Sequence, residues 1–425
     1  MTPHSSSAGK MLSRRSFMNR VLLSGGVAAV AVMAGACGSD GGSASSSPSS
    51  AAGGPPSGRP GGGPGGGTPV TYADFKGITT DGTVVEDLYS VHSTGVSTDE
   101  VRAEATAFLA ALSADQKAET LFDVEADEWF KWSNVHAYAR AGVSLADLSD
   151  VQKTAGFALL QAGLSARGLK QTRNIIRLNQ VAGELIKQTD QFNEEAYYFT
   201  VMGTPSATAP WGFQFEGHHL AINYFVLGDQ VVMTPTFMGT EPASGTYNGE
   251  EIVLFTDETQ AGLAMINSLT SAQQEKAIVS SSKTGDNEKS AAFQDNAQIP
   301  YQGVQGSTLA AAQQQKLLDL IEVYVGNIDD GHAKVKMKEV AAHLDDTYFS
   351  WAGATDDDAV FYYRVHSPVI LIEYDAQQPG PLAASYGAAQ GGAPTRNHIH
   401  TVVRTPNGND YGMDLLKQHL ETGHS

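Results

Sequence analysis

The sequence predicts an α+β fold in which a helical N-terminal part packs on a mostly antiparallel sheet. Helical periodicity dominates residues 97–190, and extended runs with a hairpin signal become prominent after residue 196. Helices followed by runs of strands are typical of α+β folds, whereas doubly wound sheets alternate the two. Neither a composition break nor an internal repeat is apparent within residues 69–425, so we expect one large domain there, with two subdomains as the alternative.

The helical segments begin near residue 97. Ser97-Thr98-Asp99-Glu100 offers capping residues ahead of an apolar stripe at helical spacing from Val101 to Leu112. Ser113 is placed to begin a second helix. The sequence predicts further helices over 150–164, 169–186, 258–282, 307–325 with Ser307 as its cap, and 411–420.

The extended segments begin with residues 197–202, followed by a loop over 203–210. Residues 211–226 then form one long extended run that is rich in aromatic side chains. Gly228-Asp229 predicts a turn into a return strand at 231–233, which is a hairpin signal. The sequence predicts later strands over 360–374 and 398–404.

The composition restricts the function. The 425 residues include 27 Lys+Arg against 46 Asp+Glu, a formal net charge of −19, whereas nucleic-acid phosphates need a basic surface. The single cysteine excludes an intramolecular disulfide, a cysteine-rich zinc site and an iron–sulfur cluster. We therefore expect no nucleic-acid partner, and we expect imidazole and carboxylate groups to be the ligands of any bound metal.

The first 37 residues have the pattern of an export signal. They carry four basic residues and no acid, and the charge-free run from Val21 to Ala36 is shorter than the roughly 20 residues of a membrane span. Arg14-Arg15 and the small residues before Cys37 resemble a twin-arginine export signal followed by a lipoprotein cleavage box. The resemblance implies removal of the signal and lipid attachment at Cys37, which is otherwise a passive residue in a tail.

Residues 38–68 are nearly all Gly, Ser, Pro and Ala. Such a segment cannot bury apolar surface, which predicts a disordered tether. We therefore expect an exported protein held by a lipid anchor at the outer face of the cell membrane, or released as an extracellular or periplasmic protein.

Two short segments concentrate histidines: Phe215-Glu216-Gly217-His218-His219-Leu220 and Asn397-His398-Ile399-His400-Thr401. Residues two apart in a strand share a face, so His398 and His400 project together, as do Glu216 and His218. Two imidazoles on one strand face can bind one metal ion. Gly217 is a possible bulge, which leaves open whether His218 or His219 faces the same way as Glu216. A hydrogen-bonded polar network and a metal-free catalytic histidine pair are the alternatives.

A third segment adds two carboxylates. Glu373 and Asp375 end the strongly apolar run that starts at Val369, and they share one strand face. They are candidates for metal ligands, for partners of ligand imidazoles, or for the solvated end of a strand. Other catalytic patterns are absent from the sequence, including G-x-S-x-G, the P-loop and H-E-x-x-H.

The motifs also resemble a bacterial family described as domain of unknown function 3500. The resemblance rests on the segments 211–220, 234–239, 362–364 with 372–375, and 397–402 with 414–416. It covers most of residues 95–422 in consistent order. It implies the extent of the domain, and export is common among members, but it implies no reaction.

These observations predict an exported, lipid-anchored metalloprotein, and more specifically a metal-dependent hydrolase whose substrate is an unidentified small molecule or polymer. The predicted metal ligands are His218, His219, His398, His400 and Asp375, and the predicted catalytic groups are Glu216, as general base, and Glu373. A divalent ion is expected, first Zn²⁺ and then copper or iron, because imidazoles suit these metals. The alternatives are a surface lipoprotein that binds a metal or small ligand without catalysis, and a redox enzyme with histidine-ligated iron or copper.

Overall fold

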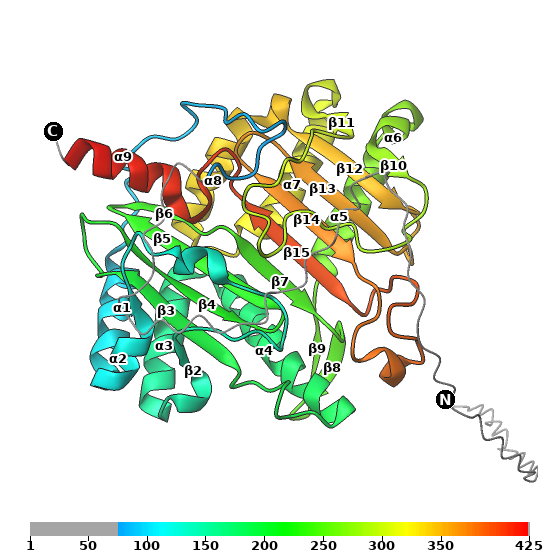
Figure 1. Ribbon diagram of the computed structural model, residues 1–425. Helices are drawn as coiled ribbons and strands as arrows, with labels where there is room; N and C mark the ends of the chain where they lie inside the picture. Colours follow the sequence, from blue (N-terminus) through cyan, green and yellow to red (C-terminus); the bar gives the residue numbers. More distant parts are fainter. Residues whose placement is uncertain (1–74, 424–425) are drawn as a thin grey trace, which may run out of the picture. The chain divides into compact units, whose positions relative to one another are not determined.

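The computed structural model describes residues 75–423, so the predicted signal, the tether and Cys37 lie outside the described part of the chain. The described residues all fall within one compact unit. They form an α+β domain with a large, mostly antiparallel sheet, which confirms the predicted fold class (Figure 1). None of the helices in residues 75–423 is long and apolar enough to cross a membrane.

The large sheet runs in the order β1-β3-β4-β5-β7-β15-β14-β13-β12-β10, with β2 beside β3, β6 beside β5, and β11 beside β12. Only β1–β3 and β10–β12 pair in parallel among these described strands. A separate hairpin joins β8 to β9. The strand bounds are β1 (Leu121–Phe122), β2 (Val143–Ser144), β3 (Tyr197–Gly203), β4 (Trp211–Gly217), β5 (Leu220–Leu227), β6 (Gln230–Val232), β7 (Thr236–Thr240), β8 (Ser244–Tyr247), β9 (Glu250–Val253), β10 (Ile278–Ser280), β11 (Val304–Gln305), β12 (Tyr348–Gly353), β13 (Phe361–His366), β14 (Leu371–Ala376) and β15 (Ile399–Arg404).

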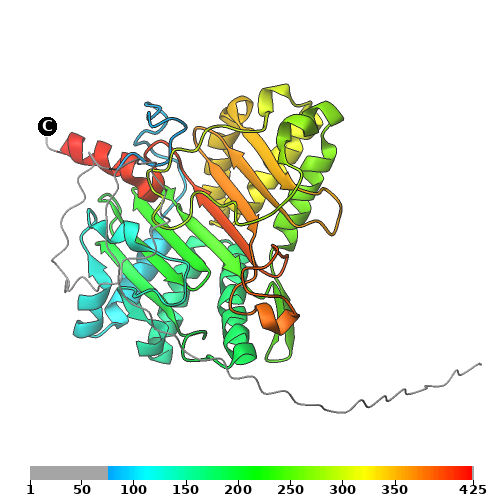
Figure 2. The same ribbon diagram turned by 45° about the vertical axis from the view of Figure 1, so that its right-hand side comes forward.

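The helices divide between the two halves of the sheet. In both views α1–α4 lie with β3, β4 and β5, and α5–α8 lie with β12, β13 and β14 (Figures 1 and 2). The α-helix bounds are α1 (Asp99–Ala111), α2 (Ala114–Thr120), α3 (Asp150–Gly163), α4 (Ala166–Ile186), α5 (Thr256–Ser268), α6 (Ser271–Ala277), α7 (Ala311–Val325), α8 (Asp330–Ala342) and α9 (Met413–Gly423).

The two halves repeat one arrangement, although no internal repeat is apparent in the sequence. The first half, residues 99–240, runs α1-α2-β1-β2-α3-α4-β3-β4-β5 before β7, and the second half, residues 256–404, runs α5-α6-β10-β11-α7-α8-β12-β13-β14 before β15. The strand pairs also correspond. The parallel pair β1–β3 matches β10–β12, and the antiparallel pair β2–β3 matches β11–β12.

A glutamine network at the helix starts is repeated as well. In the first half the Gln152 side chain donates to Ala111 O (3.0 Å) and to Gln116 Oε1 (2.7 Å). In the second half the Gln313 side chain donates to Ser268 O (2.9 Å) and to Gln273 Oε1 (2.8 Å). Such capping side chains satisfy backbone groups that a helix end leaves unpaired. The same solution in both halves supports a structural duplication.

The halves meet at β7 and β15, which pair in antiparallel fashion at the centre of the sheet. Thr236 of β7 pairs with Ile222 of β5, and Val403 of β15 pairs with Ile372 of β14. Thr236 and Val403 also pair with each other. Because equivalent residues face each other there, a local two-fold axis passes through the middle of the sheet.

The two faces of the sheet have different cores. On the helix face, Gly163 of α3 lies close enough to Tyr224 that an added Cβ would stand 3.0 Å from its ring. On the opposite face, called the loop face here, Trp129, Trp132 and Tyr411 pack with strand residues such as Phe225. The Trp132 indole donates to the Tyr411 hydroxyl at 2.8 Å. Loops and short 3₁₀ turns, not helices α1–α8, therefore cover the loop face.

Several predicted boundaries were wrong. The extended run 211–226 is two strands, with a tight turn at His218-His219. The predicted helix 258–282 is two helices followed by β10, because Thr270 caps the start of α6. Ser307 lies in a 3₁₀ turn, and α7 begins at Ala311 because the Gln313 side chain accepts from the Ala310 N–H at 2.9 Å.

Candidate metal centre

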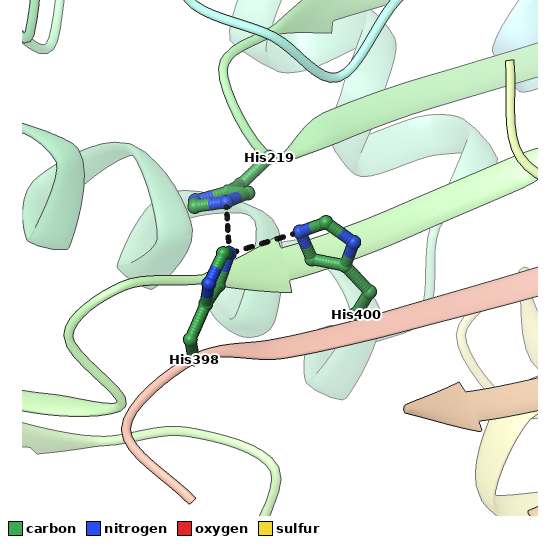
Figure 3. A group of neighbouring side chains, drawn as sticks. All are labelled: His219, His398 and His400. Atoms are coloured by element: carbon green, nitrogen blue, oxygen red, sulfur yellow. Dashed lines mark hydrogen bonds between the residues drawn. The ribbon is translucent and has the colours of Figure 1, made fainter. Parts of the chain in front are cut away.

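Three imidazoles converge on the loop face near the centre of the sheet. Nε2 of His398 lies 3.2 Å from Nε2 of His219 and 3.1 Å from Nε2 of His400 (Figure 3). One donor atom from each of the three rings falls within 4.8 Å of the other two. Within residues 75–423, these are the only three His, Cys, Asp or Glu side chains grouped tightly enough to hold one metal ion.

The β4–β5 turn positions His219. This residue has a φ of +60°, in the left-handed region that tight turns use and that a non-glycine residue seldom adopts. Its backbone N–H donates to Asn134 O (3.0 Å), and its carbonyl accepts from Gly239 N (2.7 Å). These bonds lock the turn to β7 and to the loop that carries Asn134, so the imidazole is held over the beginning of β15.

The start of β15 positions the other two imidazoles. His398 and His400 flank Ile399 and share a strand face, as the two-residue period predicts. His400 pairs with Gly239 of β7. A Cβ added at Gly239 would lie 3.1 Å from Cδ2 of His400 and 2.8 Å from Ile399 O, so a side chain there would displace the ring. The glycine therefore leaves the space that the His400 imidazole occupies.

Hydrogen bonds to Nδ1 orient two of the rings. Nδ1 of His398 lies 2.7 Å from the carbonyl oxygen of Gln378, which only accepts, so this nitrogen carries the proton. Nδ1 of His400 lies 3.0 Å from Oε2 of Glu288, which accepts from this ring when the carboxyl is ionised, although burial raises the pKa of Glu288 well above its usual range. With Nδ1 protonated in both rings, both Nε2 lone pairs point to the centre. Lone pairs about 3 Å apart repel unless a cation lies between them, and imidazole ligands of metals are commonly held in this way.

The spacing fits a metal ion. Zinc–nitrogen bonds of 2.0–2.1 Å in tetrahedral geometry place two ligand nitrogens about 3.3 Å apart. The observed separations of 3.2 and 3.1 Å are close to that value. The group His219, His398 and His400 can therefore hold a metal ion through three nitrogens.

Burial keeps the imidazoles of His219 and His400 unprotonated. The pKa of His219 and that of His400 lie well below the ordinary value of 6.5, first because burial disfavours the charged ring and then because the neighbouring imidazoles do so. The neutral ring is the form that binds metals.

His218 and Glu216 lie outside the group of three. Nδ1 of His218 lies 2.8 Å from Asn179 Oδ1, and its ring stacks on His219 at 3.9 Å between centroids. Glu216 accepts from Ser133 N at 2.9 Å and from Arg140 Nε at 3.3 Å. Burial raises the pKa of Glu216 to about 7, although Arg140 acts in the opposite direction. Both residues thus brace the surroundings of His219.

Glu373 and Asp375 also lie outside the group, where they anchor the segment before β11. Glu373 accepts from Ser290 N (2.9 Å) and from the Tyr362 hydroxyl (2.6 Å). Asp375 accepts from the backbone N–H of Glu288 at 3.0 Å, and burial raises its pKa to about 6 against the effect of Lys283. Since Glu288 contacts His400, Asp375 acts on the centre through Glu288.

Two carboxylates near the centre were not found by sequence reasoning. Glu288 contacts His400 from a segment with no regular spacing. Glu241 follows β7 directly, and the β7–β15 register places it opposite His398. It is 2% exposed, its Oε1 accepts from Gly380 N (2.8 Å) and the Tyr386 hydroxyl (2.5 Å), and its Oε2 has no hydrogen-bond partner among the described residues.

Glu241 and His398 approach the same point. A Cβ added at Gly380 would lie 2.5 Å from Oε2 of Glu241 and 3.5 Å from Cε1 of His398. A buried carboxylate oxygen without a partner is costly, so its position beside a metal-binding group is informative. The only sequence signal for Glu241 is its place two residues beyond Gly239, which requires knowing that β7 pairs with β15.

The fold and site define an α+β protein with a three-histidine group that can hold a metal. A family model described as protein of unknown function (DUF3500) matches residues 94–413, and the chain belongs to this family, as its motifs predict. No curated protein and no solved structure shows a significant match.

Proposed function

We propose that this chain is a metalloprotein in which His219, His398 and His400 bind Zn²⁺ or a similar divalent ion, and that it is a metal-dependent hydrolase. One observation carries the proposal: Nε2 of His398 lies at metal-ligand spacing from Nε2 of both His219 and His400, and the Nδ1 contact of His398 directs its lone pair toward them. A hydrogen-bonded network of neutral imidazoles accounts less well for this arrangement, because His398 Nε2 can accept only one N–H.

The ligand set favours zinc and a catalytic site. Three imidazoles without a thiolate suit Zn²⁺, copper and iron, and three protein ligands leave a fourth tetrahedral position for water. A bound ion of this kind lowers the pKa of its water toward neutrality and so supplies a nucleophile. A binding protein without catalysis more often closes the fourth position with a protein ligand.

Glu241 is the general base in this proposal, in place of Glu216. Both contacts of Glu216 Oε2 are to fixed groups, Ser133 N and Arg140, and these tie the carboxylate to the scaffold. Oε2 of Glu241 is buried, has no described partner and faces the His398 side of the centre. Gly380 N and the Tyr386 hydroxyl hold Oε1, so they fix the carboxylate and leave Oε2 to accept a proton.

Metal content tests the first part of the proposal. Protein isolated from its native export route should contain about one ion per chain by elemental analysis, and His398→Ala with His400→Ala should remove it. His366→Gln is the matched control, because His366 is a strand histidine, 1% exposed, that lies outside the group. Parent protein without metal, even after incubation with Zn²⁺, Cu²⁺ or Fe²⁺, would sink the metalloprotein proposal.

Hydrolysis tests the second part. The metal-loaded protein is assayed against ester, amide, phosphoester and glycoside panels, with the double histidine variant as blank. Hydrolysis that depends on the metal supports the proposal. A stoichiometric metal without any hydrolysis, or a metal that changes oxidation state during turnover, would contradict the hydrolase and leave a binding protein or a redox enzyme.

The proposal includes export and anchoring through Cys37. The basic start, the charge-free run and the position of the single cysteine support it. Replacement Cys37→Ser should move the protein from the membrane fraction to the soluble exported fraction, and Arg14→Lys with Arg15→Lys should block export. Unchanged membrane association of Cys37→Ser would contradict the lipid anchor.

A further inference from the structure

A cavity lies on the helix face of the two central strands, β7 and β15. Thr236 and Met238 of β7 and Thr401 and Val403 of β15 line it. Because strand residues alternate between faces, these side chains point away from the face that carries His400. The cavity and the metal centre therefore lie on opposite sides of the same pair of strands.

The cavity has the composition of a small-molecule site. Its volume is about 80 Å³, which limits a ligand to a few non-hydrogen atoms. The end of α7 and the start of α8 form its outer wall. Its apolar lining consists of Val231, Val232, Met233, Met238, Val325, Ile328, Ile370 and Val403.

One polar atom in the lining lacks a partner. Asn327 is 4% exposed, and its Oδ1 has no hydrogen-bond partner among the described residues. Its Nδ2 reaches only Sδ of Met238, at 3.8 Å, which is a weak contact. An amide buried in an apolar wall needs a donor for its oxygen, and water or a bound molecule in the cavity can supply one.

The charged residues of the lining are already paired. Lys336 donates to Val369 O (2.8 Å) and contacts Glu339 (3.2 Å). His332 bridges the Asp329 carboxylate (2.6 Å) and Asp229 O (3.1 Å). The cavity thus presents no unpaired charge among the described residues, which favours a neutral ligand.

We propose that this cavity binds a neutral, mainly apolar small molecule that donates one O–H or N–H to Oδ1 of Asn327. The apolar walls take the body of the ligand, and Asn327 selects the donor group. A short-chain alcohol such as 1-butanol has this chemistry and a size that suits the cavity, so it serves as the reference ligand. The proposal does not depend on the metal centre.

The test uses 1-butanol as the probe, and isothermal titration calorimetry measures its binding. The protein should bind it saturably at about one site per chain and at least 10-fold more tightly than it binds methyl propyl ether. The ether has the same heavy-atom count but no donor. Replacement Asn327→Leu should abolish this preference while keeping probe binding.

The second part of the test fills the cavity with a larger side chain. Val403→Trp should remove probe binding, whereas Val253→Trp, at a 65% exposed position, should leave it unchanged. Val231→Phe is the alternative filling variant if Val403→Trp does not fold. Unchanged probe binding in a folded filling variant, or equal affinity of the parent protein for the alcohol and the ether, overturns the proposal. Binding should persist in the His398→Ala, His400→Ala protein, which separates this result from the fate of the metal proposal.

Discussion

The first and second halves of the domain share a scaffold but differ at equivalent turns. Between β4 and β5 the chain turns through His218-His219, and this turn supplies one imidazole of the three-histidine group. Between β13 and β14 the chain turns through residues 367–370, where the Ser367 hydroxyl accepts from Ile370 N at 3.1 Å. The Pro368 carbonyl there accepts from Asn407 at 2.8 Å. The second turn is therefore closed by local and C-terminal contacts instead of opening on a site.

A comparison of equivalent strand positions in the two halves shows which side chains support the fold. The pairs Gly203–Trp211 and Gly353–Phe361 correspond, so Gln214–Asn223 corresponds to Arg364–Glu373. Asn223 donates to Pro235 O (2.6 Å), and Glu373 accepts from Ser290 N (2.9 Å). Asn223 thus holds the start of β7, and Glu373 holds the segment around Ser290 against the sheet. The comparison assigns Glu373 a structural role that the second half shares with the first.

The largest predicted effect concerns Glu241, a residue whose role has no equivalent in the other half. Glu241→Gln should lower kcat of the proposed hydrolysis by about 100-fold or more, because it removes a general base. The metal content should stay at the parent level, since Glu241 is not one of the three ligands. Steady-state kinetics and elemental analysis on the same preparation check both statements. Activity within 3-fold of the parent would remove Glu241 from the mechanism.

The second prediction compares the matched scaffold positions. Glu373→Ala should destabilise the fold by about 2–4 kcal/mol, because it leaves buried donors of Ser290 and Tyr362 unpaired, and Asn223→Ala should cost about 1–3 kcal/mol. Urea denaturation of each variant measures these values. A folded Glu373→Ala protein of parent stability that loses all hydrolysis would instead make Glu373 catalytic.

The third prediction uses opposite titrations at equivalent positions. Burial raises the pKa of Glu216 to about 7 and lowers that of His366 to about 3. Between pH 4.5 and 7 the native state binds the Glu216 proton more tightly than the unfolded state does. The free energy of unfolding therefore falls as pH rises through this range. Between pH 6.5 and 3 His366 is protonated more readily in the unfolded state than in the native state. The free energy of unfolding therefore falls as pH falls through this range.

The titrations of Glu216 and His366 each change the free energy of unfolding by about 1–3 kcal/mol. Unfolding free energies of the parent, Glu216→Gln and His366→Gln proteins at pH 5 and pH 7.5 separate the two. Glu216→Gln should remove the loss at higher pH, and His366→Gln should remove the loss at lower pH. Parallel pH profiles in all three proteins would contradict both assignments.

The smallest predicted effect tests the repeated network. Gln152→Ala and Gln313→Ala should each cost about 1 kcal/mol, because each removes one capping side chain and its bond to the preceding helix end. The two values should agree within about 0.5 kcal/mol if the halves are equivalent. Thermal or urea unfolding measures the two free-energy changes. Strongly unequal values would show that the two halves share the geometry of this network but not its contribution to stability.

Local patterns in the sequence were sufficient to predict part of the fold and of the site. The α+β class followed from periodicity, and the joint projection of His398 and His400 followed from the two-residue period of a strand. The choice between His218 and His219 stayed open because Gly217 ends β4 and the turn places consecutive residues differently. A turn and a bulge look alike in a single sequence.

The remaining features depend on contacts between distant segments. Glu241 faces His398 only because β7 pairs with β15, and Glu288 reaches His400 only because Asp375 and Glu373 anchor its segment. The repeat was not apparent because the halves keep the order of elements while their side chains differ, as Asn223 and Glu373 do. Register between strands far apart in the chain cannot be read from either strand alone.

The two-fold axis between Thr236 and Val403 has a consequence for how the molecule can vary. In a symmetric dimer of identical half-length subunits, any substitution appears twice, so both equivalent turns would carry the same residues. Here both halves belong to one chain, and each copy of a position is encoded separately. One turn can therefore contribute to a site while the other keeps only packing contacts, and residues 75–423 hold one three-histidine group despite their paired architecture.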